Sequence, residues 1–550
     1  MVCIATITWG CVNPDRASDD GMDEKPPFTW NNANVYFLLT DRFNNGDPGN
    51  DINFGRTEST AVNRGFMGGD LEGVTQKIEE GYFTDLGITA LWMTPFYEQI
   101  YGLVDEGTGD TYGYHGYWTK DWTALDPNFG SKADLEQLVR TAHEHDIRII
   151  MDVVINHTGP VTEQDPVWPE AWVRTSPKCT YEGYESTIEC TLVDNLPDIR
   201  TETETDVPLP PQLLDKWARE GRLEQELSEL DAFFETTGYP RAPKYYIIKW
   251  LTDYIRKYGI NGYRLDTAKH TEEDVWSDLR KEAERAYNEW LAAHPDKFPG
   301  EPFYMVGEVY NYVISGGRLF DYGDTLVDFY AEGIDHLINF EFKYDARNHY
   351  EALFSKYSSI LHDELEGKGV MNYLSSHDDS DPFDKMRELP FKAATKLLLC
   401  PGASQVYYGD ESSRLLFAPG ANGDANLRSF MNWDKLEENA DMNGYRLQEI
   451  LEHYSKLGKF RRDHPAVGAG MHEMISMDPY IFKRTYTFGN QTDKVVIGLD
   501  LATGNKDINV EDVFKNGTEL IDSYSGEKVV VRNGSASFRS DASIALLSRL

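Results

Sequence analysis

The sequence is poor in basic residues and has no long hydrophobic run. Its 550 residues include 53 Lys and Arg against 92 Asp and Glu, which gives a formal net charge of -39. Nucleic acids and anionic membranes carry charge of the same sign and would repel the chain, whereas a neutral ligand is compatible with it. No stretch approaches the roughly 18 consecutive apolar residues of a membrane-spanning helix. We therefore expect no nucleic-acid partner and no transmembrane segment.

Cysteine is also scarce, with five in the chain. Cys179 and Cys190 bracket a short segment and form either a disulfide or two free thiols; a disulfide would fit an exported protein. Cys400 ends an apolar run and is expected to be a buried thiol. The first ten residues, followed by Cys11, look like a short export signal that ends in a lipoprotein-type Gly-Cys, although a chance match explains them equally well. We expect an extracytoplasmic protein: periplasmic, secreted or lipid-anchored at the cell surface.

From Asn34 onward, short β-type apolar runs alternate with longer helical patterns, as in parallel strands joined by crossover helices. Eight such runs predict an α/β protein with a closed (β/α)8 TIM barrel. The expected strands are residues 35–40, 89–94, 148–155, 262–266, 303–307, 337–342, 370–375 and 405–408. Helices with apolar residues at spacings of three and four are expected at residues 71–86, 132–145, 244–258, 273–293 and 445–462.

Two regions depart from the barrel pattern. Residues 158–243 are too long for a loop between a strand and its helix, so they predict an inserted subdomain after strand 3, domain B. Residues 466–550 hold short alternating segments separated by Asn-Gly and Gly-Asn turns, and they predict a C-terminal antiparallel β-sandwich, domain C. Residues 1–30 are expected to be a leader and acidic linker, which leaves 31–157 and 244–465 for the barrel, domain A.

Polar residues follow four of the predicted strands. Reactive side chains in a parallel barrel lie where the strands end at the carboxyl face. Any one such residue could cap a helix or form a structural ion pair, but four strand ends of this kind together favour a catalytic site. The four strand ends are Asp152-Val-Val-Ile-Asn156-His157, Gly262-Tyr-Arg264-Leu-Asp266, Met305-Val-Gly-Glu308 and Leu374-Ser-Ser-His377-Asp378.

Arg264 and Asp266 are two residues apart on one strand, so both side chains point into the barrel mouth. The guanidinium would keep Asp266 ionised, as a nucleophile that attacks the anomeric carbon of a sugar must be. Glu308 fits the role of the acid that protonates the leaving oxygen, with its pKa raised by the negative charges of Asp266 and Asp378. Asp378 would then stabilise the oxocarbenium-like sugar, while His377 binds its hydroxyls.

These motifs, in this order and with this long insert, resemble glycoside hydrolase family 13, the α-amylase family. Residues 34–470 follow the family plan. Three further matching segments are Gly113-Tyr-His115-Gly-Tyr117-Trp118, Leu196-Pro197-Asp198 and Thr267-Ala-Lys269-His270. Closer still to bacterial periplasmic α-amylases are residues 373–378, 403–414, 431–433 and 464–470. The resemblance implies a retaining α-amylase that hydrolyses internal α-1,4-glucosidic bonds of starch, glycogen or maltodextrins through a covalent glycosyl-enzyme intermediate.

The resemblance also implies roles for individual residues. It supports Asp266 as nucleophile, Glu308 as acid/base and Asp378 as transition-state stabiliser. Tyr117 would form the aromatic platform under the scissile sugar, with a core position as the alternative for it and for Trp118. The implied substrate-binding residues are His115, Tyr117, Trp118, His157, Arg264, Lys269, His270, His377, Asp424 and Arg428, of which the pair Asp424 and Arg428 departs from the family spacing by one residue.

A structural calcium ion commonly joins the insert to the barrel in this family, and calcium needs oxygen ligands. The matching positions are Asn156, Asp198, the carbonyl of His270 and, offset by one residue, Glu189. Chloride-activated relatives carry Asn directly before the His-Asp pair, where this chain has Ser376. We therefore predict calcium and no chloride.

Three alternatives to an internally cutting hydrolase remain open. They are an α-glucan transglycosylase, an exo-acting maltogenic enzyme, and a catalytically inactive glucan-binding protein that keeps the barrel. The motifs do not decide between water and a second sugar as acceptor. All three carboxylates are present, which favours an enzyme over a binding protein. We expect a monomer that acts on α-glucans.

Overall fold

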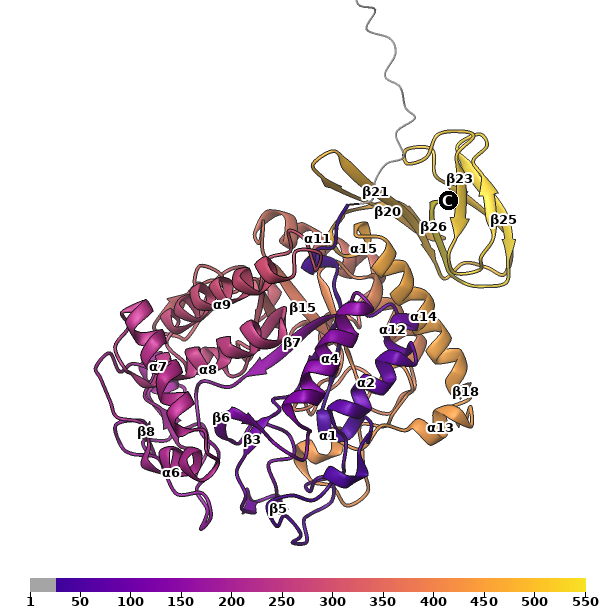
Figure 1. The fold of residues 1–550 in the computed structure, drawn as a ribbon. Helices are drawn as coiled ribbons and strands as arrows, with labels where there is room; N and C mark the ends of the chain where they lie inside the picture. The colour runs from indigo at the N-terminus through magenta and orange to yellow at the C-terminus, as the bar shows by residue number, and fades with distance from the viewer. Residues whose placement is uncertain (1–25) are drawn as a thin grey trace, which may run out of the picture.

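The computed structural model describes residues 26–550, in which eight parallel strands close into a barrel surrounded by helices (Figure 1). Neighbouring strands follow the order β1-β16-β15-β14-β11-β10-β7-β2. The strands are β1 Asn34–Leu38, β2 Ala90–Met93, β7 Arg148–Val153, β10 Gly262–Leu265, β11 Tyr304–Gly307, β14 His336–Asn339, β15 Gly369–Tyr373 and β16 Ala403–Tyr407. The predicted TIM barrel and its eight strands are therefore confirmed.

Every residue of the eight barrel strands is buried. Helices cover the outside of the barrel and side chains fill its interior, which explains why these strands appear in the sequence as near-continuous apolar runs. Charged residues within such strands, Asp152 in β7 and Arg264 in β10, must find partners inside the protein because a buried unpaired charge is costly.

The outer ring contains the helices predicted from apolar spacing, with two corrections. The predicted helix 71–86 is two helices, because Gly81 adopts a left-handed conformation with φ of 81° that interrupts the α-helix. The predicted helix 445–462 begins at Leu447, since Tyr445–Arg446 form the short strand β18. The ring helices are α2 Leu71–Glu79, α3 Tyr82–Asp85, α4 Lys132–Glu144, α8 Pro243–Tyr258, α9 Asp274–Ala293, α11 Tyr350–Asp363, α12 Pro390–Leu399 and α14 Leu447–Asp463.

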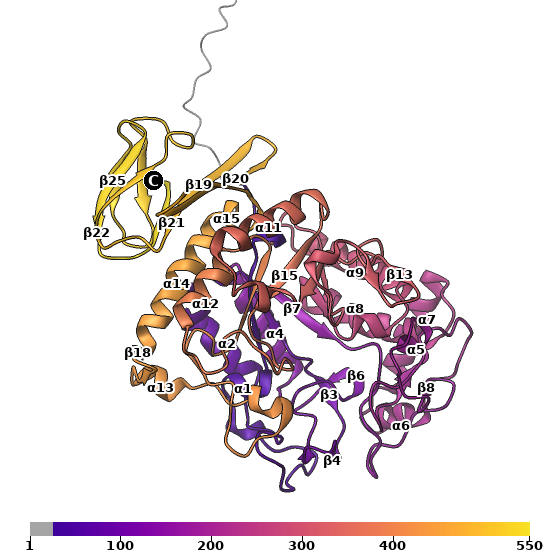
Figure 2. The ribbon, with the colours of Figure 1, turned by 180° about the vertical axis from the view of Figure 1, so that it is seen from behind.

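Between β7 and α8 the chain leaves the barrel and builds an insert. Its elements are β8 Val173–Arg174, α5 Glu185–Ile188, β9 Asp198–Ile199, α6 Pro211–Arg219 and α7 Leu223–Thr237. A disulfide joins Cys179 and Cys190 within it, which confirms the first of the two alternatives for this pair. Figure 2 shows the insert and the C-terminal strands at opposite ends of the barrel, as Figure 1 does from the other side. We propose residues 158–243 as domain B.

The C-terminal region is an antiparallel β domain, as predicted. Six strands follow the order β19-β20-β21-β26-β23-β24, and β22 pairs with β25 separately. Side chains alternate along β20: Ile481 packs into a core within this region, whereas Phe482 joins the core of the barrel. The strands are β19 Met471–Met477, β20 Tyr480–Phe488, β21 Gln491–Leu499, β22 Gly504–Asn509, β23 Glu519–Asp522, β24 Lys528–Val530, β25 Ser535–Ser540 and β26 Ala545–Arg549. We propose residues 466–550 as domain C.

Three smaller predictions concern Cys400, the membrane and the start of the chain. Cys400 is fully buried as a free thiol, as expected. No helix within the described residues is both long and apolar enough to cross a bilayer. Cys11 and the segment that resembles an export signal lie outside the residues that the structure describes.

Candidate active site

One arginine contacts three carboxylates at the carboxyl ends of neighbouring barrel strands. Nη1 of Arg264 donates to Asp152 Oδ1 at 2.9 Å and to Asp266 Oδ1 at 2.7 Å, and Nη2 lies 2.9 Å from Glu308 Oε2. All four side chains are buried. We refer to these residues as the Arg264 cluster. Three acids around one guanidinium leave an excess of negative charge in a pocket shielded from water, so at least one of them is expected to bind a proton.

The barrel strands set the positions of these side chains. Arg264 in β10 is the register partner of Asp152 in β7. The ladder continues past the strand ends, because the amides of Asp266 and Glu308 each donate to a carbonyl of the neighbouring strand at 3.0 Å. Reactive groups on adjacent paired strands are held more rigidly than groups on loops, which is the requirement for a preorganised site.

Glu308 has a strongly shifted acidity. Its pKa is raised to about 8: burial is the largest cause, the contact with Arg264 opposes it, and the charges of Asp266 and Asp378 add to the rise. The predicted direction is confirmed, but the prediction named the neighbouring charges as the cause, and burial is the larger one. A carboxyl with this pKa keeps its proton at neutral pH, which is the form a general acid needs.

Asp152 belongs to the site although the sequence analysis assigned it no role. Its Oδ2 accepts hydrogen bonds from Trp92 Nε1 at 3.0 Å and from the Tyr117 hydroxyl at 2.8 Å. Burial raises its pKa to about 6, and Arg264 is the largest opposing influence. Asp152 therefore positions both the guanidinium and the ring of the predicted platform. Its signal in the sequence is a lone acid inside the apolar run 148–155.

Asp378 follows β15 and is the most open of the three predicted catalytic carboxylates. Its side chain is 36% exposed, against 8% for Asp266 and 9% for Glu308. Its Oδ1 accepts a hydrogen bond from the Ser376 hydroxyl at 3.3 Å. The structure thus brings the three carboxylates into one region, with Asp378 on the side that a ligand can reach.

Tyr117 and three histidines lie beside the carboxylates. The Tyr117 ring stacks on His377 with centroids 5.3 Å apart and lies 5.8 Å from His115. The Tyr117 amide donates to His115 Nδ1 at 3.1 Å, and His157 Nε2 lies 3.1 Å from the Tyr117 carbonyl. Burial lowers the pKa of all three histidines. Neutral imidazoles beside an aromatic ring are well matched to uncharged sugar hydroxyls.

Trp118 differs from Tyr117 in its surroundings. Its side chain is buried in a small apolar cluster with Ile100 and Leu196, and its amide donates to Gln99 Oε1 at 2.7 Å. This placement favours the core alternative for Trp118, whereas Tyr117 is partly exposed.

Asp424 and Arg428 form an ion pair of 2.7 Å despite their unusual spacing. A second arginine, Arg64, contacts the other oxygen of Asp424 at 2.7 Å. The sequence analysis missed Arg64, which lies 360 residues away in the chain. Arg428 also donates from Nε to the carbonyl of His377 at 2.9 Å, so this ion-pair group is bonded directly to the strand end that carries Asp378.

Lys269 and His270 make different contacts. Lys269 Nζ donates to the carbonyl of Tyr310 at 3.2 Å and lies 5.6 Å from the centre of the Phe320 ring. His270 is buried, and its Nδ1 lies 3.0 Å from the carbonyl of Thr187 in the insert. One nitrogen of His270 is therefore used to attach the insert, and a substrate-binding role for this residue stays a prediction.

The predicted calcium ligands lie where the insert meets the barrel, but an arginine lies among them. Nε of Arg174 is 3.1 Å from Asp198 Oδ2, and Nη1 is 3.5 Å from Glu189 Oε2. Within residues 26–550, no three His, Cys, Asp or Glu side chains are grouped so as to hold a metal ion. A guanidinium repels a divalent cation, and this one lies beside two of the carboxylates that calcium would need. These residues do not fit calcium, whose binding here stays a prediction from the family resemblance alone.

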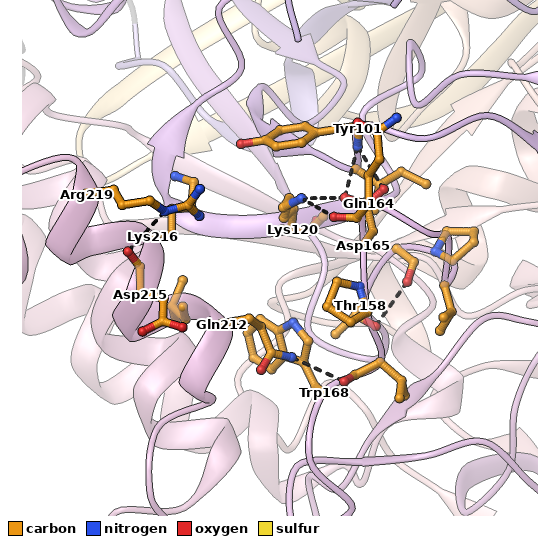
Figure 3. Close-up of a pocket in the computed structure, with 18 residues that line it drawn as sticks. Tyr101, Lys120, Thr158, Gln164, Asp165, Trp168, Gln212, Asp215, Lys216 and Arg219 are labelled. Atoms are coloured by element: carbon orange, nitrogen blue, oxygen red, sulfur yellow. Dashed lines mark hydrogen bonds and ion pairs between the residues drawn. The ribbon is translucent and has the colours of Figure 1, made fainter. Parts of the chain in front are cut away.

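A separate cavity of about 390 Å³ lies between the barrel and the insert (Figure 3). Strand β6, Thr119–Leu125, the segment after β7 and helix α6 contribute its lining, and Lys120 forms an ion pair with Asp165 there. Of the described residues that line it, none is a predicted catalytic or substrate-binding residue. The cavity is therefore distinct from the Arg264 cluster.

Comparison with known proteins gives consistent matches. The family model for the α-amylase catalytic domain matches residues 37–184. The periplasmic α-amylase of Escherichia coli (strain K12) is 35% identical, over 90% of this chain and 76% of that protein. A cyclomaltodextrin glucanotransferase of Thermoanaerobacterium thermosulfurigenes is 26% identical, over 90% of this chain and 64% of that protein.

Solved structures match over nearly the whole chain. An Anoxybacillus α-amylase superposes with a TM-score of 0.63 at 23% identity, covering 95% of this chain and 99% of that one. An α-amylase from Geobacillus thermoleovorans, solved with acarbose, gives a TM-score of 0.63 at 21% identity, covering 95% of this chain and 100% of that one. At these identities the structural matches show a shared fold.

Proposed function

The chain belongs to the α-amylase family of glycoside hydrolases, and from that premise we propose that it hydrolyses internal α-1,4-glucosidic bonds of starch, glycogen or maltodextrins with retention. The observation that carries this mechanism is the contact of one guanidinium, that of Arg264, with both Asp266 and Glu308. One guanidinium in contact with both carboxyl groups holds them close together, as the double displacement of a retaining glycosidase requires.

In this mechanism Asp266 attacks the anomeric carbon while Glu308 gives its proton to the leaving oxygen. The glycosidic bond breaks, and the sugar becomes covalently attached to Asp266. Glu308, now a carboxylate, takes a proton from the water molecule that attacks the anomeric carbon, and the bond to Asp266 breaks. The raised pKa of Glu308, about 8, supports its role because the first step requires the protonated carboxyl.

The surrounding residues would bind the sugar ring and its neighbour. Asp378 places negative charge near the anomeric carbon, where positive charge develops in the transition state. The Tyr117 ring would lie under the scissile sugar, and the histidines around it would bond to hydroxyls. The ion-paired Asp424 and Arg428 would hold the sugar on the non-reducing side. The glucan groups that these residues would contact carry no charge, which is compatible with a protein of net charge -39.

We further propose an extracytoplasmic location and a monomeric state. A relative that is 35% identical is a periplasmic enzyme. The disulfide between Cys179 and Cys190 fits an oxidising compartment.

Product analysis tests the proposal. The full chain is incubated with maltoheptaose and the products are followed by chromatography; we expect short linear maltodextrins of several lengths from the first minutes onward. Cyclic or lengthened products would identify a transglycosylase, the second candidate, which the glucanotransferase relative favours. Release of maltose alone, from chain ends, would identify an exo-acting enzyme.

A further inference from the structure

A second arginine surrounded by acids lies at the base of the insert. Besides Asp198 at 3.1 Å and Glu189 at 3.5 Å, the Arg174 guanidinium contacts Glu202, with Nη2 2.5 Å from Oε1. The Arg174 side chain is 6% exposed. These contacts are ion pairs by distance, and the Nε of Arg174 is buried without a hydrogen-bond partner, so the guanidinium acts here through its charge. We refer to these four residues as the Arg174 cluster.

The backbone connects the Arg174 cluster directly to the barrel. Arg174 in β8 is the cross-strand partner of Asp198 in β9. Asp198 also forms a β-bridge with His157, and the next amide, of Ile199, donates to the carbonyl of Asn156 at 2.8 Å. Asp198 therefore lies in the segment of the insert that pairs with the chain after β7.

The acids at this junction need a positive charge between them. The side chain of Asp198 is 3% exposed, and Glu202 contacts the same guanidinium. The Arg174 guanidinium lies 3.1 Å from the Asp198 carboxylate and is 6% exposed. Arg200 is 31% exposed and pairs with Glu202 at 3.5 Å, so solvent screens its charge more.

We propose that Arg174 takes the place of a structural calcium ion at this junction, so that the attachment of the insert does not depend on bound calcium. Calcium requires about six to eight oxygen ligands at close range. Two of the predicted ligands, Asp198 and Glu189, already contact the guanidinium. The positive charge is thus part of the chain, and a chelator does not remove it.

The first experiment compares thermal unfolding of the full chain in excess EGTA and in millimolar CaCl2. We expect the same Tm within about 1 °C, because only a ligand that binds the native state changes it. Calorimetric titration of CaCl2 into EGTA-treated, desalted protein is expected to show no stoichiometric binding. One calcium ion per chain that stabilises the wild type and is lost in Asp198→Asn would overturn the proposal.

The second experiment tests the arginine itself. Arg174→Gln is expected to lower the Tm by about 5 °C, because it removes a buried cation that contacts three acids. Arg200→Gln is the matched control, because Arg200 directly follows β9 and shares the partner Glu202, and it should shift the Tm by less than about 1 °C. If Arg174→Gln does not fold, Arg174→Lys keeps the positive charge without the planar guanidinium, and this variant is expected to fold with a smaller decrease in Tm. Equal shifts for the Arg174 and Arg200 variants would contradict the proposal.

Discussion

The barrel mouth and the base of the insert each contain one buried arginine with three carboxylate partners. In the Arg264 cluster the acids come from three neighbouring barrel strands, and their side chains are 0%, 8% and 9% exposed. In the Arg174 cluster they come from the insert alone, and their side chains are 3%, 50% and 30% exposed. The two groups are alike in composition and differ in what encloses them.

Enclosure determines what each group can do. At the barrel mouth, burial raises the pKa of Glu308 to about 8 and so supplies a proton donor beside Asp266. In the Arg174 cluster burial also raises the pKa of Asp198, to about 9, but the other two acids are 50% and 30% exposed and none follows a barrel strand, so the arrangement serves attachment. An arginine among acids is therefore no catalytic signature by itself; the burial of its partners and the strands that carry them make the difference.

The largest difference between the two clusters should appear in activity. Asp266→Asn is expected to lower kcat on soluble starch by about 10⁴-fold, because the nucleophile is lost, with little change in Tm. Glu202→Gln removes one acid from the Arg174 cluster and is expected to keep activity at 25 °C. Reducing-sugar assays and thermal unfolding measure the activity and the Tm of both variants. Equal loss of activity in the two variants would contradict the functional difference between the clusters.

Glu308→Gln should lower activity on starch by about 10³-fold, because the leaving oxygen no longer receives a proton. The loss should be much smaller on an aryl maltoside whose leaving phenol needs no proton. In the wild type, the raised pKa predicts that activity persists to about pH 8 and falls above it. A wild-type activity that already falls between pH 5 and 6 would contradict the acid role of Glu308.

The same carboxyl should also make stability depend on pH. Its pKa is raised from 4.5 to about 8 in the folded protein, so the folded state retains a proton that the unfolded state releases between these values. This contribution to the free energy of unfolding is full below about pH 4.5 and is lost as the pH rises through about 8. Urea unfolding of Glu308→Gln and wild type at pH 5 and pH 8 should show the smaller pH dependence in the variant.

Arg64→Gln should affect binding more than chemistry. Asp424 would lose one of its two arginine partners, so the KM for maltoheptaose is expected to rise about tenfold with a smaller change in kcat. Steady-state kinetics measure the two constants, with Arg200→Gln as control. A fall in kcat at constant KM would place Arg64 in the chemical step instead.

The smallest effect should come from the disulfide of the insert. The double variant Cys179→Ser and Cys190→Ser is expected to lose about 2 kcal/mol of unfolding free energy, because the short closed loop restricts the unfolded chain only modestly. Activity at 25 °C should remain. Dithiothreitol should lower the Tm of the wild type as much as the double substitution does. A loss of activity with unchanged Tm would indicate that the disulfide shapes the active site.

The sequence predicts the barrel well because its strands are buried on both faces and appear as apolar runs. It predicts helix 71–86 as one helix because apolar spacing continues across Gly81, whose left-handed backbone is invisible to that pattern. Asp266 and Glu308 are predictable for a similar reason: each directly follows a strand whose position is clear, and Asp378 lies a few residues beyond the end of β15.

The contacts that the sequence does not predict depend on pairing between distant segments. Arg64 meets Asp424 across 360 residues. Arg174 meets Asp198 because β8 and β9 pair, and two-residue strands leave almost no periodicity to detect. Calcium is predicted from the family resemblance, and the arginine that contacts two of the implied ligands becomes apparent only when the insert is folded.

Trapping the covalent intermediate tests the assignment of Asp266 most directly. A 5-fluoro-α-maltosyl fluoride has a good leaving group but a slowed second step, so the glycosyl-enzyme should accumulate. Mass spectrometry of the digested protein is expected to locate one sugar adduct on the peptide that contains Asp266, and none in Asp266→Asn. An adduct on the peptide of Glu308 or Asp378, or release of a product with inverted configuration, would contradict the account.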